Sequence, residues 1–221
     1  MLFPSTEFAK LKEYLVLYKC ALKNLQMRVD ILLDDFSNFQ ENNPIEHIKT
    51  RLKTPESIAE KLHRQNYPLT ADSAVKNLTD IAGMRCICAY TNDIYYISEV
   101  LKKQPDMAVR IVKDYVTYPK PSGYRSYHLI LDIPIYLTSR SICLPVEIQI
   151  RTQSMEFWAS LEHKAKYKFK NDMPKDLSDR LIACADEIAA LDERMHAIQE
   201  ELADRASSPK NITVARTFHS R

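Results

Sequence analysis

Glycine is nearly absent from this 221-residue chain, which contains only Gly83 and Gly123. Two glycines cannot build either of the common glycine-rich phosphate loops, GxxxxGK and GxGxxG. If the protein handles nucleotides, cationic side chains and a metal ion must therefore hold the phosphates. The net charge is only +2, too small to indicate a nucleic-acid partner by itself, so any cationic site must be a local cluster.

The chain also lacks membrane, secretion and disulfide signals. No apolar run approaches the roughly 20 residues that span a bilayer, and the first residues, MLFPSTEFAKLKEYL, lack the layout of a secretory signal. The five cysteines are odd in number and scattered, and none has zinc-ligand spacing. We expect a cytoplasmic protein with reduced thiols and no membrane partner. The cysteines are Cys20, Cys86, Cys88, Cys143 and Cys184.

Apolar residues at both ends of the chain recur at alternating spacings of three and four, which is a heptad pattern. One such seam runs from Phe8 to Phe36 and the other from Leu177 to Leu202. Each seam alone can pack on the chain's own core, but two long terminal seams together favour subunit contacts. We expect residues 1–43 and 173–206 to form helices that contact other subunits in a homo-oligomer.

The tail, residues 207–221, contains cations and no acidic residue. A segment of this composition has too little apolar surface to support a packed structure. We expect it to be disordered.

The middle of the chain, residues 44–172, alternates strand-like and helix-like patterns. Strands are expected in HIKTRLK, IAGMRCICAY, VRIVKDYV, YHLILDIPIYL and CLPVEIQIRT. Helices are expected in PESIAEKLHRQ, in NDIYYISEVLKK with Asn92 as its cap, and in SMEFWASLEHKAKYK. The pattern predicts one α/β domain of mixed α+β character, with a five-stranded mixed sheet flanked by helices.

One predicted strand, VEIQIRT, carries a polar face. Its apolar residues alternate with Glu147, Gln149 and Arg151, which share the other face. That face either meets water, as in an ordinary half-buried strand, or floors a cleft in which a carboxylate accepts a proton or holds Mg²⁺. Asp80, just before another strand, is a second candidate ligand for a hard cation. Gly83 close behind it would let a ligand approach the backbone.

The segment PKPSGYRSYH, residues 119–128, surrounds one glycine with aromatic and basic residues. An exposed Tyr124 would offer a flat face on which a purine can stack. Lys120 and Arg125 flank it with charges suited to phosphates, and His128 begins the next strand. The alternative is a basic surface loop whose tyrosines cover the core.

Five motifs occur in the order seen in the synthetase domain of the RelA/SpoT alarmone synthetases, and the chain resembles this family over about residues 45–170. The motifs are TRLKTPESIAEKL, TDIAGMRCIC, YPKPSGYRSYH, VEIQIRT and MEFWASLEHKAKYK. With helices at both ends, the chain is similar to the small alarmone synthetases. The sequence contains no His-Asp pair, and we expect no hydrolase activity.

The resemblance implies a nucleotidyltransferase-like sheet and a reaction. The family transfers pyrophosphate from ATP to the ribose 3′-hydroxyl of GDP or GTP, forming ppGpp or pppGpp and releasing AMP, with Mg²⁺ as cofactor. The resemblance also implies a homotetramer. The preferred acceptor and any effector are not indicated by the sequence.

The resemblance further implies roles for individual residues. Asp80 would bind Mg²⁺, and Glu147 would help to bind it and activate the 3′-hydroxyl. The ATP-binding positions would be Arg51 and Arg85 at the adenine, with Lys53, Ser57 and Lys61 around the phosphates. The guanine-nucleotide positions would be Tyr124, stacked on the base, with Lys120, Arg125 and His128 toward the phosphates.

Two other interpretations remain open from the sequence. A non-catalytic guanine-nucleotide sensor would keep the pocket and act through the helical arms, although it would gain little from Asp80 and Glu147. An RNA-binding module would use the lysines of HKAKYKFK and the basic tail. Those lysines are equally suited to the C-terminal end of a helix, where cations are favoured.

Overall fold

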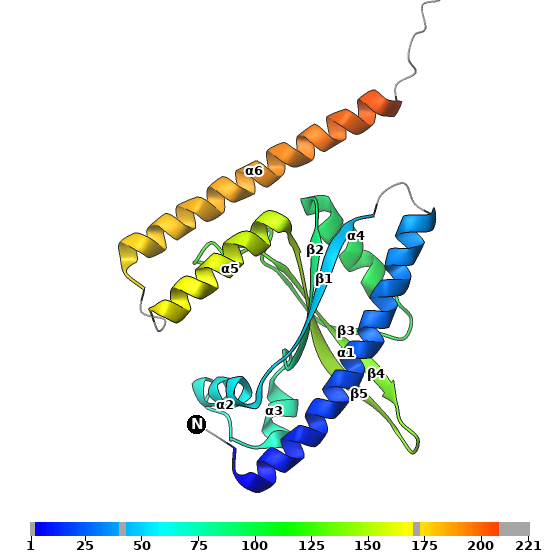
Figure 1. Ribbon diagram of the computed structural model, residues 1–221, viewed down its shortest axis with the longest axis vertical. Coiled ribbons are helices and arrows are strands. Elements are labelled where there is room, and N and C mark those ends of the chain that lie inside the picture. The colour runs from blue at the N-terminus through cyan, green and yellow to red at the C-terminus, as the bar shows by residue number, and fades with distance from the viewer. Residues whose placement is uncertain (1–2, 40–42, 170–172, 208–221) are drawn as a thin grey trace, which may run out of the picture.

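The computed structural model describes residues 3–39, 43–169 and 173–207. A five-stranded sheet lies at its centre, in the order β1-β2-β5-β4-β3 (Figure 1). The strands are β1 Ile45–Leu52, β2 Ala82–Cys88, β3 Ala108–Asp114, β4 Tyr127–Tyr136 and β5 Ser141–Thr152. The helices are α1 Ser5–Phe39, α2 Pro55–Arg64, α3 Ala71–Asn77, α4 Thr91–Lys102, α5 Gln153–Lys168 and α6 Lys175–Ser207. All five predicted strands are confirmed, and the sheet is mixed as expected.

The pairing of the strands determines which residues meet. β2 and β5 run parallel, with Gly83 opposite Glu147. The other neighbours are antiparallel, and β4 and β5 form a hairpin in which Tyr136 lies opposite Ser141. Val146, Ile148 and Ile150 of β5 are completely buried in the core. The predicted alternation of VEIQIRT is therefore confirmed.

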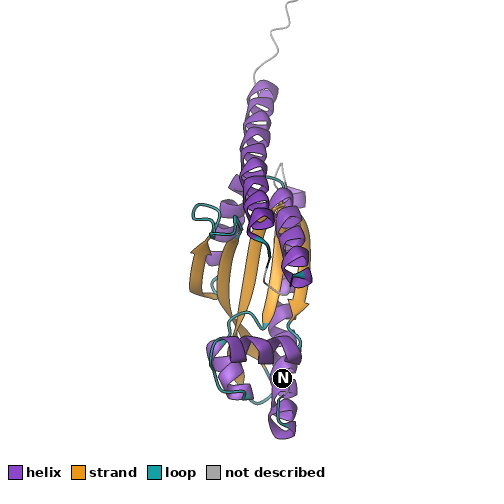
Figure 2. Cartoon of the chain, turned by 90° about the vertical axis from the view of Figure 1, so that its left-hand side faces the viewer, coloured by secondary structure: helices purple, strands orange, loops and turns teal. Residues whose placement is uncertain are grey.

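Helices cover both faces of the sheet. α1 contacts β1, β2, β4 and β5, and α4 contacts β2 and β5, on the side where the apolar face of β5 lies (Figure 1). α5 packs on the opposite side, and α6 packs on α5. Figure 2 shows α6 continuing past the end of the sheet.

The apolar seam of α1 is part of the chain's own core. Its residues face the sheet and are buried; they include Leu11, Tyr18, Leu22, Leu25, Val29 and Phe36. Intramolecular packing, the alternative to a subunit contact, is therefore what the structure shows for this seam. The sheet covers this seam because α1 crosses the sheet diagonally and contacts β1, β2, β4 and β5 (Figure 1).

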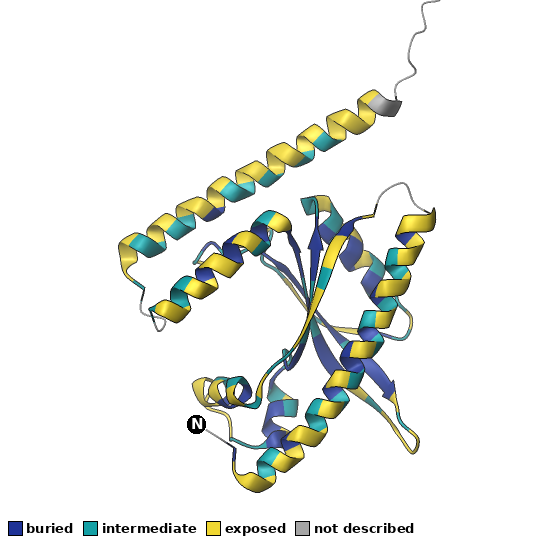
Figure 3. Ribbon diagram, in the orientation of Figure 1, coloured by how far each residue is buried: buried dark blue, intermediate teal, exposed yellow. Residues whose placement is uncertain are grey.

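The seam of α6 divides into two parts. Near its start, Ala185 is buried against α5, and the indole N–H of Trp158 donates a hydrogen bond of 2.8 Å to the carbonyl of Leu181. Farther along, the apolar side chains lie in solvent (Figure 3). These exposed residues are Leu191, Met195, Ile198 and Leu202.

Three details differ from the sequence predictions. The short helix α3, capped by the Thr70 hydroxyl, was not expected. The cap of α4 is Tyr90 rather than Asn92, because Asp93 accepts the backbone N–H of Tyr90 at 3.0 Å and Asn92 lies inside the first turn. Ser207 still belongs to α6, and the rest of the predicted disordered tail lies outside the described residues.

Across the ranges that the structure describes, the helices are too short or too polar to cross a bilayer.

Gly123 allows the loop before β4 to approach α6. Its φ is +86°, and a Cβ placed there would lie 2.8 Å from the Cβ of Ala185. A side chain at this position is therefore both strained and in collision with a helix.

We predict that Gly123→Ala lowers the free energy of unfolding by about 1–3 kcal/mol, measured by urea denaturation. Gly83→Ala is the matched control, because a Cβ there would meet nothing closer than the Glu147 carbonyl oxygen at 3.6 Å. Equal effects of the two substitutions would contradict the described packing of α6.

Candidate active site

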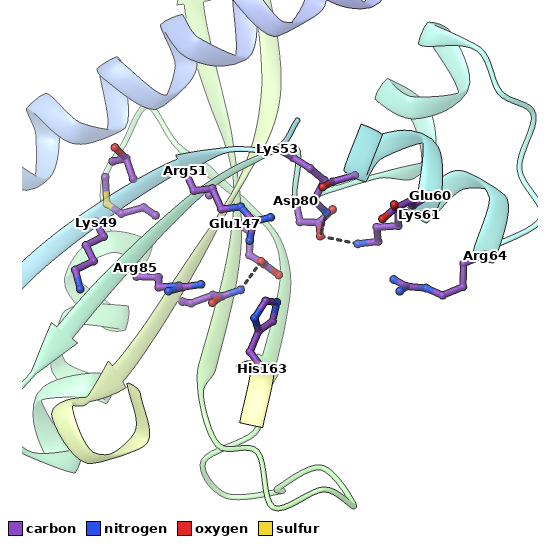
Figure 4. A pocket seen from close by; sticks show the side chains of 15 residues that line it. Lys49, Arg51, Lys53, Glu60, Lys61, Arg64, Asp80, Arg85, Glu147 and His163 are labelled. Atoms are coloured by element: carbon purple, nitrogen blue, oxygen red, sulfur yellow. Dashed lines mark hydrogen bonds and ion pairs between the residues drawn. The ribbon is translucent and has the colours of Figure 1, made fainter. Parts of the chain in front are cut away.

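A cleft of about 580 Å³ opens beside β1, β2 and β5, between α2 and α5 (Figure 4). Seven of the residues predicted from the sequence line it together: Arg51, Lys53, Ser57, Lys61, Asp80, Arg85 and Glu147. They come from six separate elements or loops, so it is the tertiary fold that brings them together. The cleft is also lined by Lys49, Glu60, Arg64, Gln149 and His163.

Local structure brings two of the cations in the cleft together. The backbone N–H of Lys53 donates to the Ile81 carbonyl at 2.8 Å, which ties the end of β1 to the start of β2. Thr54 caps α2 by accepting the N–H of Ser57 at 3.3 Å, and Pro55 occupies the first turn. Lys53 and the lysine of the second turn, Lys61, consequently meet at the same point.

That point is Asp80. Its Oδ2 accepts hydrogen bonds from Lys53 Nζ and Lys61 Nζ, both at 2.6 Å (Figure 4). Burial acts to raise the pKa of Asp80, but the two ammonium groups outweigh it and the pKa lies below its ordinary value. For Lys53 the effect of burial is the larger one: it lowers the pKa of the ammonium group, although Asp80 acts to raise it. Asp80 is therefore an ionised carboxylate at neutral pH.

Glu147 is the second carboxylate of the cleft. Its Oε1 lies 3.2 Å from His128 Nδ1, and its Oε2 accepts a 2.7 Å hydrogen bond from Gln149 Nε2. Burial acts to raise the pKa of Glu147, but these partners outweigh it and the pKa is lowered. Burial lowers the pKa of His128 despite the carboxylate beside it. At neutral pH the arrangement is a carboxylate beside a neutral imidazole.

The two carboxylates fit a magnesium ion. Asp80 Oδ1 is buried and has no hydrogen-bond partner among the residues that the structure describes, so one oxygen of this carboxylate is left unpaired there. Within the described ranges, no group of three His, Cys, Asp or Glu side chains is placed to hold a metal. Mg²⁺ commonly binds one or two carboxylates together with substrate phosphates, and two carboxylates in one cleft are compatible with a site of that kind.

Tyr124 is not the exposed platform that the sequence predicted. Its hydroxyl bonds to His128 Nε2 at 2.8 Å and to Arg151 Nη2 at 2.5 Å, and its ring is half-buried beside Trp158. Lys120 Nζ lies 4.7 Å from the ring centroid. The prediction of exposure is wrong because α5 and α6 close over this loop. Stacking on guanine stays a prediction, and it requires Lys120 to leave the ring.

Arg125 points away from the cleft. Its Nη2 donates to Asp186 Oδ1 of α6 at 3.1 Å, and its Nη1 donates to the Val116 carbonyl at 3.3 Å. The structure therefore brings Lys120, Tyr124 and His128 to the neighbourhood of Glu147, but not Arg125.

Several polar residues of this region were assigned no role from the sequence, among them Gln149, Arg151, Glu156 and His163. Glu156 connects the two sides of the site, because its Oε1 accepts from Arg85 Nη1 at 3.0 Å and its Oε2 accepts from Arg151 Nη1 at 2.6 Å. Glu156 and His163 are seven residues apart on α5, a spacing that places both on one helix face. That spacing was the only available signal, and it does not tell which way the face points.

Comparisons with known proteins show the family to which the chain is related. Residues 50–172 match the family described as "Region found in RelA / SpoT proteins". The chain is 45% identical to GTP pyrophosphokinase YwaC of Bacillus subtilis over 86% of its own length and 91% of that protein. It is 35% identical to GTP pyrophosphokinase YjbM of the same organism, with coverage of 86% and 89%.

Solved structures show the same fold. The crystal structure of small alarmone synthetase 2 from Bacillus subtilis superposes with a TM-score of 0.78 at 45% identity, over 86% of this chain and 98% of that one. Small alarmone synthetase 1 from Bacillus subtilis, bound to its product pppGpp, superposes with a TM-score of 0.83 at 34% identity, over 88% and 99%.

This chain belongs to the RelA/SpoT family. Within that family it is similar to the small alarmone synthetases over nearly the whole length of each.

We predict that Glu156→Gln lowers the free energy of unfolding by about 1–3 kcal/mol, because an amide has one acceptor oxygen for two guanidinium groups. Chemical denaturation measures the effect. Glu99→Gln is the control: Glu99 pairs with Lys102 at 2.8 Å on the surface, where an ion pair contributes little. If the Glu156 variant were as stable as the Glu99 variant, the contacts of Glu156 with Arg85 and Arg151 would not contribute to stability.

Proposed function

We propose that this protein is a GTP pyrophosphokinase that synthesises (p)ppGpp as a signal of the stringent response. It transfers the β,γ-pyrophosphate of ATP to the ribose 3′-hydroxyl of GDP or GTP and releases AMP. The observation that carries the proposal is that two ionised carboxylates, Asp80 and Glu147, lie in one cleft with a set of fixed cations. The similarity to GTP pyrophosphokinases along nearly the whole chain supports it.

The cations would bind and orient ATP. Lys53 and Lys61 already meet beside Asp80, where polyphosphate oxygens would compete for their ammonium groups. Ser57 lies in the first turn of α2, where backbone N–H groups favour an anion. Arg51 and Arg85 line the same cleft, and their planar guanidinium groups suit stacking on adenine.

Glu147 would act on the acceptor. The 3′-oxygen forms the new bond to the β-phosphorus of ATP, the bond from that phosphorus to the α-phosphate oxygen breaks, and the hydroxyl proton passes to Glu147. General-base assistance of this kind is worth about 10²–10⁴-fold in rate. The carboxylate suits this role because its pKa is held low enough to keep it ionised at neutral pH.

Mg²⁺ would be held by Asp80, through the oxygen that has no hydrogen-bond partner among the described residues, and by Glu147. When bound, it would neutralise charge on the transferring phosphates. Tyr124, Lys120 and His128 would bind the guanine nucleotide from the side of the cleft nearest Glu147.

The non-catalytic sensor has no support from the comparisons, since the relatives are named for synthesis. Use of RNA as a partner stays a prediction. The cations at the end of α5, Lys166 and Lys168, lie in its last turn, which favours the helix-end interpretation for them. We place the protein in the cytoplasm, in keeping with cysteines that are free throughout the described part of the chain.

The proposal is tested by incubating the purified protein with Mg²⁺, labelled ATP, and GDP or GTP. We expect AMP and a guanine nucleotide phosphorylated on its 3′ side, and loss of both products when EDTA removes the metal. Nucleotide binding without either product would favour the sensor.

We predict that Glu147→Gln lowers kcat by about 10²-fold or more, while the affinity for both nucleotides changes little. The amide keeps the shape of the carboxylate but cannot accept the hydroxyl proton. Initial rates and equilibrium binding separate the two effects. Near-normal synthesis by this variant would exclude Glu147 as the base.

We also propose a homo-oligomer, a tetramer by family resemblance, that buries the exposed stripe of α6. Its apolar side chains lie in solvent and follow a heptad spacing. We predict that the double substitution Ile198→Asp and Leu202→Asp reduces the molar mass measured by light scattering. Tyr136→Asp, at another exposed apolar site, on β4, is the control and should leave the mass unchanged. An unchanged mass in the double variant would remove α6 from the interface.

A further inference from the structure

Arg151 is a deeply buried charged side chain beside the cleft. It is only 4% exposed, and all three of its guanidinium nitrogens donate hydrogen bonds. Nε donates to Ser126 Oγ at 3.1 Å, and Nη1 donates to Glu156 Oε2 at 2.6 Å. These two bonds fix the guanidinium plane between β5 and α5.

The remaining nitrogen, Nη2, begins two branches that end on the same carboxylate. In one branch it donates to Gln149 Oε1 at 2.6 Å, and Gln149 Nε2 donates to Glu147 Oε2 at 2.7 Å. In the other it donates to the Tyr124 hydroxyl at 2.5 Å, that hydroxyl bonds to His128 Nε2 at 2.8 Å, and His128 Nδ1 meets Glu147 Oε1 at 3.2 Å. The five side chains form a closed ring.

The chemistry of the donors gives the ring a direction. Arg151 can only donate, and ionised Glu147 can only accept. The amide of Gln149 must therefore turn its oxygen to Arg151 and its nitrogen to Glu147. Since the Tyr124 oxygen accepts from Arg151, its own hydrogen is directed to His128 Nε2. His128 must then carry its proton on Nδ1, facing Glu147.

We infer that Arg151 is a positioning residue for the reaction: by fixing the Gln149 amide, the Tyr124 hydroxyl and the His128 tautomer, it holds both oxygens of Glu147 in one orientation. The inference rests on the proposed function, in which Glu147 is the reacting carboxylate. Arg151 itself does not line the cleft, so it acts through its neighbours. Each oxygen of Glu147 keeps further lone pairs for the ribose hydroxyl or Mg²⁺.

The competing interpretation is that Arg151 only stabilises the fold through its ion pair with Glu156. Arg151→Lys distinguishes the two. A lysine keeps a positive charge beside Glu156, but its single tetrahedral nitrogen cannot reproduce the planar fork that serves Gln149 and Tyr124 together.

In the positioning interpretation, Arg151→Lys remains folded and its kcat falls by about 10²-fold, because a displacement of the reacting group by an ångström has an effect of that size. The KM values for ATP and for the guanine nucleotide change much less. Arg110→Lys is the matched control: Arg110 pairs with Asp132 at 2.7 Å, on strands outside the cleft, and its kcat should equal that of the unchanged protein.

Tyr124→Phe tests the branch through His128 alone. It also tests the inference if the Arg151→Lys variant does not fold. It keeps the aromatic ring and removes only the hydroxyl that directs His128. We expect the KM for the guanine nucleotide to be retained and kcat to fall.

The His128 tautomer gives a readout that does not depend on catalysis. Nitrogen NMR of the ¹⁵N-labelled protein, without nucleotide or metal and at a pH where the imidazole is neutral, should show His128 protonated on Nδ1. A His128→Gln variant assigns the signals. In Tyr124→Phe and in Arg151→Lys we expect a mixture of tautomers.

An unchanged tautomer in both variants, or a kcat near that of the unchanged protein in a folded Arg151→Lys variant, would overturn the inference. The proposed function fails separately, if the unchanged protein makes no 3′-phosphorylated product; the NMR result then still decides whether the ring exists.

Discussion

The parallel pairing of β2 with β5 is the constraint from which the site follows. It sets Gly83 opposite Glu147, so that Asp80, just before β2, and Glu147, within β5, reach one cleft. β1 pairs with β2 on the other side and brings Arg51 opposite Gly83. A slip of one residue in β5 would turn Glu147 into the apolar core under α1 and bring Ile148 to the cleft. Burial of the apolar face of β5 therefore also secures the position of Glu147 in the cleft.

Part of the charge in the cleft is paired within the chain before substrates arrive, although cations outnumber carboxylates along its lining. Two lysines share one oxygen of Asp80, and the histidine beside Glu147 is neutral. The arrangement replaces what a glycine-rich loop would provide: backbone N–H groups in such a loop bind phosphate without formal charge, whereas here ammonium and guanidinium groups must do so. These groups need carboxylate partners when the cleft holds no polyphosphate, because an unpaired buried charge is costly.

The side of the site that carries Tyr124 and His128 is built against the C-terminal helices. Gly123 packs under Ala185, Arg125 pairs with Asp186, and Glu156 of α5 ties Arg85 to the ring around Glu147. The helical arm and the cleft are thus parts of one packed structure rather than separate modules. A change in the packing of α6 would reach Tyr124 directly, since both belong to the cluster around Trp158.

The sequence alone was sufficient for the strands, the main helices, the polar face of VEIQIRT, and the motif order that identifies the family, because these depend on spacing between near neighbours in the chain. Only the tertiary structure decided that the α1 seam packs on its own sheet, that Tyr124 is covered, that Arg125 turns to α6, and that Arg151 lies at the centre of a ring. These features depend on contacts between residues far apart in sequence, such as Arg85 with Glu156. A periodic pattern tells which residues share a face, but the docking of helices on the sheet determines what that face meets.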